Sequence, residues 1–462
     1  MNTEIWRRPA TLVALLVVGV AIVALLFFVF AGGSPSASPL PSASPTAAAQ
    51  VSPSVGTSLL PGATIGPGTS PSSQPTGSPE PSTSPEPSPS APITPAPVTP
   101  GPATIAPGVS PSAAPSTGWI ELDDFPTYGR ATEVSSITAG GLGFVAVGWS
   151  GRTTSQGRVW TSQDGRSWTA QPDAIFAGLE LDIVVRAGQT LYAFGDSRVW
   201  SSPDGATWTE LPPPALDGYI SDVAVSGNTL IAVGGVFDED EFESAAVWRS
   251  DDGTTWQRVG APPVDTGLYT VAATGGVLVA SQGYPQSSPP LLWFSTDLGD
   301  TWQPAQTDLD PEGDANLGVV DIATDGGRFV AVGYEERDDY EPLMLVSTDG
   351  ADWQSANVPP AAAGQIFDQV TAGPGGYTAL AHRSGGDGQS WTSANGADWA
   401  AGPTIYQRNL VFQPGDTPGD DVVTHRALAV GAAGAVVAEF WRFAEPGEGG
   451  LHVWFAPSSA FD

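Results

Sequence analysis

The chain has 462 residues, of which 49 are acidic and 16 are basic, and its formal net charge is −33 at pH 7. All the basic residues are arginine, and we expect no nucleic-acid partner because a phosphate backbone is bound through clustered cations. The absence of cysteine excludes disulfides, thiolate metal sites and a thiol nucleophile. A cationic peptide, a divalent ion and a neutral glycan remain compatible with this charge.

Residues 11–31 form an uninterrupted run of apolar and small residues. A helix needs about 20 such residues to cross a hydrocarbon layer of about 30 Å. Arg7 and Arg8 precede the run and the next charged residue is Glu80, so residues 1–10 are expected in the cytoplasm and the rest outside the cell. We therefore predict a single-pass signal anchor. It would hold the protein in a cell membrane, with most of the chain exposed at a bacterial cell surface. The alternative is a cleaved signal peptide ending at Ala31, but the run is longer than the usual apolar region of about 7–15 residues.

Residues 32–117 are rich in proline, serine, threonine, alanine and glycine and contain no aromatic residue. Such a segment cannot bury enough apolar area to offset the entropy lost on ordering. Its repeated Ser-Pro steps favour extended polyproline II at about 3.1 Å per residue. We expect a disordered stalk that could carry O-linked sugars.

From residue 118 to the end of the chain, a short motif recurs six times, with its tryptophans 40 to 51 residues apart. Each copy has a serine, then aspartate or asparagine before a glycine in a tight turn, then tryptophan. This spacing is the length of a four-stranded propeller blade. Asp-Gly and Asn-Gly tolerate positive φ, and the side chain can accept N–H bonds from its own turn. We interpret the repeated residues as structural, because six copies cannot form one active centre; they are Asp164, Asp204, Asp252, Asp297, Asp349 and Asn395, with Trp168, Trp208, Trp256, Trp302, Trp353 and Trp399.

The motif closely resembles the Asp-box, or BNR, repeat. Its fourth copy, from Ser295 to Trp302, has the full Ser-x-Asp-x-Gly-x-Thr-Trp spacing, and the other five copies are one residue shorter. Proteins with similar boxes include sialidases, sortilin-type receptors and photosystem assembly factors. The resemblance implies an all-β propeller over residues 118–462 and leaves the function open.

Seven apolar strand pairs accompany the six turns, which predicts seven blades. The seventh unit contains the strand around Trp454 but ends without a repeated turn. Its missing outer strand is found at residues 118–122, which resemble the outer strand after Trp208. We therefore predict that pairing of the N- and C-terminal strands closes the ring and leaves no exposed edge.

Acidic residues gather in the predicted loops between the second and third strands of two blades. Asp238, Asp240, Glu335 and Asp338 could offer oxygen ligands to Ca²⁺, although the spacing does not match an EF-hand. We favour a solvated acidic face with no bound cofactor. His382, His425 and His452 lack metal-ligand spacing and are interpreted as incidental.

Two functional hypotheses follow for this chain. The first is a non-enzymatic binding or scaffold module whose loops engage a protein, peptide or glycan. The second is a sialidase-like hydrolase, as the family resemblance implies. Sialidases bind the substrate carboxylate with three arginines, for which Arg130, Arg186 and Arg426 are the loose candidates; no catalytic residue is assigned, because their Arg-Ile-Pro motif is replaced here by Arg130-Ala131-Thr132. We favour the binding module.

The predicted anchor should keep the protein with membranes during alkaline carbonate washing, because an apolar helix of this length is released only by detergent. Fractionation followed by immunoblotting measures this. Recovery of a mature form that begins near Gly32 in the culture medium would instead establish cleavage.

Overall fold

The structure, a computed structural model, describes residues 118–129, 131–214, 216–282, 291–309, 316–336, 340–383, 388–406, 422–442 and 450–461. The expected cytoplasmic segment, membrane anchor and stalk lie outside these residues. Within the part of the chain that is described, no helix is both long and apolar enough to cross a membrane.

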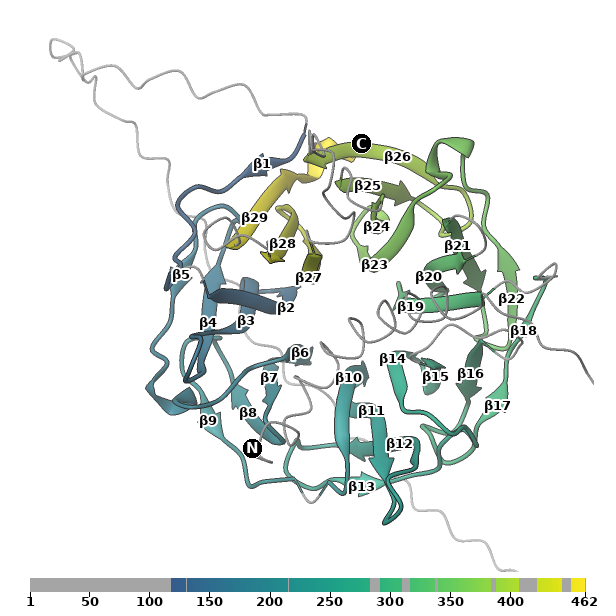
Figure 1. The fold of residues 1–462 in the computed structure, drawn as a ribbon, viewed down its shortest axis with the longest axis horizontal. Helices are drawn as coiled ribbons and strands as arrows, with labels where there is room; N and C mark the ends of the chain where they lie inside the picture. The colour runs from purple at the N-terminus through teal and green to yellow at the C-terminus, as the bar shows by residue number, and fades with distance from the viewer. Residues whose placement is uncertain are drawn as a thin grey trace, which may run out of the picture. The chain divides into compact units, whose positions relative to one another are not determined.

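Seven sheets are arranged in a ring, and each contains a set of four antiparallel strands, to which one sheet adds a fifth strand (Figure 1). This confirms the predicted seven-bladed β-propeller. We number blades 1 to 7 by their innermost strands, which are β2 (Thr132–Gly140), β6 (Ile183–Ala187), β10 (Tyr219–Ser226), β14 (Leu268–Thr274), β19 (Asn316–Thr324), β23 (Ile366–Gly373) and β27 (Val422–Gly431).

The remaining strands follow outward in each blade. The second strands are β3 (Gly143–Ser150), β7 (Thr190–Gly195), β11 (Thr229–Phe237), β15 (Val277–Gln282), β20 (Phe329–Glu336), β24 (Gly376–His382) and β28 (Gly434–Arg442). The third strands are β4 (Gln156–Ser162), β8 (Arg198–Ser202), β12 (Glu243–Ser250), β16 (Leu292–Ser295), β21 (Tyr340–Ser347), β25 (Gly388–Ser393) and β29 (Gly450–Pro457). The outermost strands are β5 (Thr169–Ala170), β9 (Thr209–Glu210), β13 (Gln257–Arg258), β17 (Gln303–Pro304), β22 (Asp352–Ser355), β26 (Ala400–Tyr406) and β1 (Ile120–Glu121).

The core lies between neighbouring blades. Both faces of a blade pack against other blades, so the second strands are apolar almost without interruption, as in Val145, Ala146 and Val147 of β3. Trp160 and its counterparts on other third strands are buried in the same layers. Each blade therefore contributes side chains to two clusters, and the ring is stabilised mainly by this apolar contact.

The two ends of the chain meet in blade 7. Strand β1 pairs with β29 in antiparallel register, with Ile120 opposite Phe455 and Glu121 opposite Trp454. The N–H of Leu122 extends the pairing by donating to the carbonyl of Val453 at 2.8 Å. The predicted closure of the ring is thus confirmed (Figure 1).

Blade 5 differs from the expected four strands. A short strand, β18 (Gln306–Thr307), pairs in parallel with β22, so this sheet has five strands. The pairing arises because the connection that leaves blade 4 runs along the outer edge of blade 5. A parallel bridge between Asn357 and Asp398 makes the same kind of contact between blades 5 and 6.

The ring has two functionally different ends. We call the end with the second-to-third strand hairpins and the blade-to-blade connections the loop face. The opposite end, with the first-to-second strand turns and the six repeated turns, is the turn face. Three short 3-10 helices complete the described structure, namely η2 (Ala174–Phe176), η3 (Pro360–Ala362) and η4 (Ser458–Ala460).

Candidate functional site

The six repeated turns have one hydrogen-bond pattern, seen clearly in the first copy. Asp164 Oδ1 accepts the N–H groups of Arg166 and Ser167 at 2.9 and 2.8 Å. Ser162 Oγ accepts the N–H of Gly165 at 2.8 Å, and Trp168 Nε1 donates to the Gly165 carbonyl at 2.9 Å. Gly165 has a φ of 74°, which a side chain would strain. The repeated polar atoms are therefore occupied within their own turn.

The charge of these aspartates is stabilised by the turn itself. Backbone N–H bonds from Thr255 and Thr254 lower the pKa of Asp252 well below its usual range. Asp204 has its pKa lowered in the same way by Thr207 and Ala206. These shifts follow from turn geometry, so they do not indicate a catalytic acid or base.

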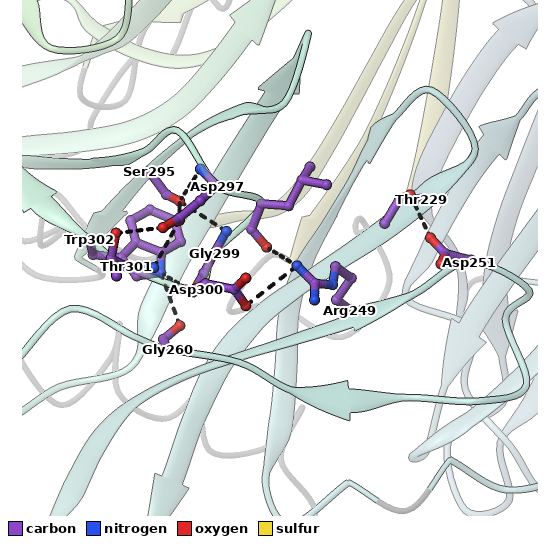
Figure 2. A network of polar contacts seen from close by, with 11 residues as sticks. Thr229, Arg249, Asp251, Gly260, Ser295, Asp297, Gly299, Asp300, Thr301 and Trp302 are labelled. Carbon is purple, nitrogen blue, oxygen red and sulfur yellow. Dashed lines mark hydrogen bonds and ion pairs between the residues drawn. The ribbon is translucent and has the colours of Figure 1, made fainter. Parts of the chain in front are cut away.

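The fourth turn is longer by one residue and also links two blades (Figure 2). Leu298 takes the extra position with a φ of 57°. Trp302 Nε1 lies 3.1 Å from the carbonyl of Gly299 and 3.0 Å from that of Gly260, which leads from blade 3 into blade 4. Arg249 on β12 donates to the Leu298 carbonyl at 3.3 Å and lies 3.5 Å from Asp300. At this position hydrogen bonds of the fourth turn connect blades 3 and 4.

A second set of polar contacts joins the innermost strands. Several innermost strands contain a β-bulge, and the side chain that follows the bulge accepts a hydrogen bond from the next blade. In blade 1 this residue is Ser136, which accepts the N–H of Val184 at 3.2 Å. Asp222 accepts that of Val271 at 2.9 Å. Asp321 likewise accepts the N–H of Val370 at 2.8 Å. Polar side chains at the centre of the ring are thus used to connect blades 1 to 2, 3 to 4 and 5 to 6.

Asp222 and Asp321 approach the same residue of blade 4. Thr270 Oγ1 lies 3.0 Å from Asp222 Oδ2 and 3.5 Å from Asp321 Oδ1. Desolvation raises the pKa of Asp321 to about 7; the N–H bond from Val370 opposes this rise, and the nearby charge of Asp222 adds to it. The pKa of Asp222 is also raised by desolvation. Desolvation thus raises the pKa of both carboxyl groups at the centre of the ring.

A charged cluster connects blades 6 and 7. Arg426 Nε donates to Glu439 Oε1 at 3.0 Å, and a second nitrogen of Arg426 pairs with Asp368. The Asp368 carboxylate also lies 2.7 Å from His382 Nδ1. Only 9% of the Arg426 side chain and 2% of the Glu439 side chain are exposed. Desolvation opposes the charge on Asp368, but Arg426 and His382 outweigh it and leave the pKa lowered. The cluster is mutually neutralising, so it does not offer a free cation.

The loosely proposed arginine triad gains no support from the described residues. Arg426 is engaged as above, and Arg130 lies outside the described residues. Arg186 pairs across from Leu191 beside the β6–β7 turn, whereas Arg426 lies across from Glu439. Counted from the turn between the first and second strands, Arg426 lies about four residues farther along its strand than Arg186 does, or about 13 Å. Arg186 therefore lies at the turn face, whereas Arg426 lies near the middle of its strand.

The acidic loop residues are divided between described and undescribed positions. Asp238 and Asp240 lie in the β11–β12 hairpin and Glu335 in β20, while Asp338 falls outside the described residues. Among residues that are described, no group of three or more His, Asp or Glu side chains is arranged to hold a metal ion. His452 lies 2.6 Å from Glu121 of β1, and His425 is on β27.

Exposed aromatic side chains at the loop face were not recognised in the sequence. Phe242 is 72% exposed and Phe237 is 52% exposed, at the two ends of the β11–β12 hairpin. Tyr269, at the bulge of β14, is 43% exposed. The available signal was the pair Phe237 and Phe242 on either side of four carboxylates, which is unusual for a solvated loop. These residues make the loop face the candidate functional surface.

One comparison with known proteins, the match to a family profile, agrees with the propeller fold. Residues 116–237 match the sequence profile of a family described as DUF6242 beta propeller domain, which spans blades 1 and 2 and the first two strands of blade 3. A search of curated proteins found no match. Among solved structures, the Pan2 WD40 domain of Neurospora crassa is similar, with 12% identity, a TM-score of 0.43, and coverage of 75% of this chain and 98% of that chain. Neither match identifies a ligand or an activity.

The partly buried carboxyl pair at the centre of the ring predicts a pH effect on stability. The pKa of Asp321 is about 7 in the folded protein and about 4 in an unfolded chain. Because the folded value is the higher one, the contribution of Asp321 to stability is fully present below about pH 4 and is lost as the pH rises through about 7. Relative to the parent protein, Asp321→Asn should therefore gain on the order of 2 kcal/mol between about pH 4 and pH 8, after allowance for solvent screening.

Chemical denaturation of both proteins at the two pH values measures this difference. Asp123→Asn, at an exposed position, is the control and should show no comparable change. A free-energy difference between Asp321→Asn and the parent that stays constant with pH would contradict the assignment.

Proposed function

We propose that this protein is a non-enzymatic binding or scaffold module whose loop face engages a protein, peptide or glycan. One observation carries the proposal. Arg426 pairs with Asp368 and Glu439, and the innermost-strand carboxylates Asp222 and Asp321 accept backbone N–H groups of the next blade. Aromatic side chains, by contrast, are exposed on the loop face. A catalytic site needs polar groups that converge on a substrate, and a binding surface needs exposed groups that a partner can cover.

The repeated turns support an Asp-box identity for the propeller. Their aspartates cap backbone N–H groups, and their tryptophans pack between blades, as at Trp168. In this interpretation the repeat supplies scaffold, and the loops supply specificity.

Export is the second part of the proposal. The apolar run at residues 11–31 and the two preceding arginines favour a signal anchor, and residues 32–117 favour an extended stalk. Together they would hold the propeller away from the membrane, at a bacterial cell surface. Such an arrangement suits a module that reaches for a ligand outside the cell.

A sialidase-like hydrolase is the competing function. It requires three arginines close to one carboxylate, and Arg186 and Arg426 lie about four residues apart in height along the inner strands, or about 13 Å. Arg426 also has two acidic partners already. No observation on the described residues favours this second function over the first.

The proposal predicts that ligand binding depends on the loop face. The purified full-length chain should bind particular spots on an array of peptides and oligosaccharides, and Phe237→Ala combined with Phe242→Ala should reduce these signals about tenfold or more, because exposed aromatics often dominate an interface. Leu142→Ala is the matched control, since Leu142 is an exposed apolar residue in the β2–β3 turn of the turn face.

Signals that survive the double loop-face substitution, or that are lost with Leu142→Ala, would contradict a loop-face binding site. Turnover of a fluorogenic sialoside by the same preparation, abolished by Arg130→Ala, would replace the binding module with a hydrolase.

A further inference from the structure

We propose that the loop face of blades 3 to 5 binds a cationic peptide segment that also carries apolar side chains. This inference rests on the proposed binding function and names its ligand class. It is carried by exposed aromatic side chains on blades 3 and 4, a half-buried tyrosine pair on blade 5, and the carboxylates beside them on blades 3 and 5.

The β11–β12 hairpin of blade 3 is the centre of this surface. Phe242 is 72% exposed, and four consecutive carboxylates lie between Phe237 and Phe242. Asp238 Oδ1 accepts the N–H groups of Asp240 and Phe242, both at 2.9 Å. The hairpin is therefore fixed with its aromatic ring directed away from the core, and a partner that covers the ring need not first order the loop.

Aromatic pairs with adjoining carboxylates occur on blades 3 and 5. The ring of Phe237 packs on Tyr219 at 6.0 Å between centroids, and the Tyr219 hydroxyl donates to Glu243. In blade 5, Tyr334 and Tyr340 form an edge-to-face pair at 5.5 Å. Glu335, Glu336 and Glu341 belong to the same two strands of blade 5.

Blade 4 lies between these two hairpins and contributes Tyr269. This tyrosine sits at the bulge near the start of β14, at the loop-face end of the strand. Desolvation raises its pKa, and the charges of Asp321, Asp368 and Asp222 add to the rise. Blades 3, 4 and 5 thus place aromatic rings in a negative field at one end of the ring.

The described basic residues of these blades do not neutralise that field. Arg249 is near Asp300 on the turn side, and Arg258 pairs with Asp217. Arg328 lies in the β19–β20 turn of the turn face. Arg337, which lies between Glu336 and Asp338 in the sequence, is outside the described residues.

This surface favours a peptide that carries guanidinium or ammonium groups together with apolar side chains. Such a cation can stack on an aromatic ring and pair with a carboxylate at the same time. A polyanion is repelled, and a metal ion lacks a converging set of three described ligands. An adjoining apolar side chain of the peptide would cover Phe242, which explains why a ring so exposed is held in place.

Fluorescence anisotropy with the purified full-length chain tests the inference. The probe is a labelled peptide of sequence Gly-Arg-Leu-Arg-Gly-Arg-Leu-Arg-Gly, and the matched peptide has citrulline in place of every arginine. We expect saturable binding of the arginine peptide that weakens with salt, and at least tenfold weaker binding of the citrulline peptide, about the effect of losing several charge-assisted contacts.

Two loop-face variants and one matched control locate the site. Phe242→Ala should raise the Kd about tenfold, and Glu239→Gln with Asp240→Asn about fivefold. The control, Asp123→Asn with Asp124→Asn, removes the same charge from exposed residues between β1 and β2 and should change the Kd less than about twofold. Unchanged thermal midpoints verify that the variants are folded.

Equal weakening by the two charge-removing pairs, or equal binding of both peptides, would overturn the inference, because attraction to the acidic chain would then be unspecific. Binding of a neutral oligosaccharide in the array, without binding of the arginine peptide, would also overturn it but would leave the proposed binding function intact. Sialoside turnover would instead remove the binding function.

Discussion

Closure of this ring depends on strand β1, which comes from the N-terminal end of the propeller and completes blade 7. Blade 7 has three strands of its own, and without β1 the outer edge of β29 would present unpaired N–H and C=O groups. Strand β1 fills that edge, and Trp119 adds an edge-on contact with Phe461 at 5.8 Å. The N-terminal strand must therefore be in place before the seventh blade is complete, which couples the two ends of the domain.

Closure leaves two kinds of polar residue with different tasks. Those in the repeated turns and on the innermost strands bond to backbone groups of their own or the next blade, as Asp164 and Asp222 do. They stabilise a rigid ring and have little bonding capacity left for a ligand. The hairpins between second and third strands do not hold neighbouring blades together in this way. Variation there can therefore alter binding without loss of the fold. This division is why we place function on the loop face.

The sequence predicted the features that repeat or alternate. Blade number, the repeated turns and the origin of the seventh outer strand follow from the spacing of Trp168 to Trp399 and from the match between residues 118–122 and the strand after Trp208. Contacts between blades were not predictable in this way. The cluster of Asp368, His382 and Arg426 joins residues up to 58 positions apart, and strand β18 depends on the path of one connection. A spacing rule cannot predict such pairings. Arg186 and Arg426 also show how composition alone can suggest a convergence that their positions along the strands do not support.

The most direct test of ring closure compares two chains that begin at Ser116 and at Thr127. The shorter chain lacks Trp119 to Leu122 and therefore the whole of β1. The account predicts a lower midpoint of thermal unfolding for it and about 3 kcal/mol or more of lost stability, from the exposed edge and the missing tryptophan contact. Equal midpoints for the two chains would show that blade 7 is stable without its N-terminal strand, and would contradict the account.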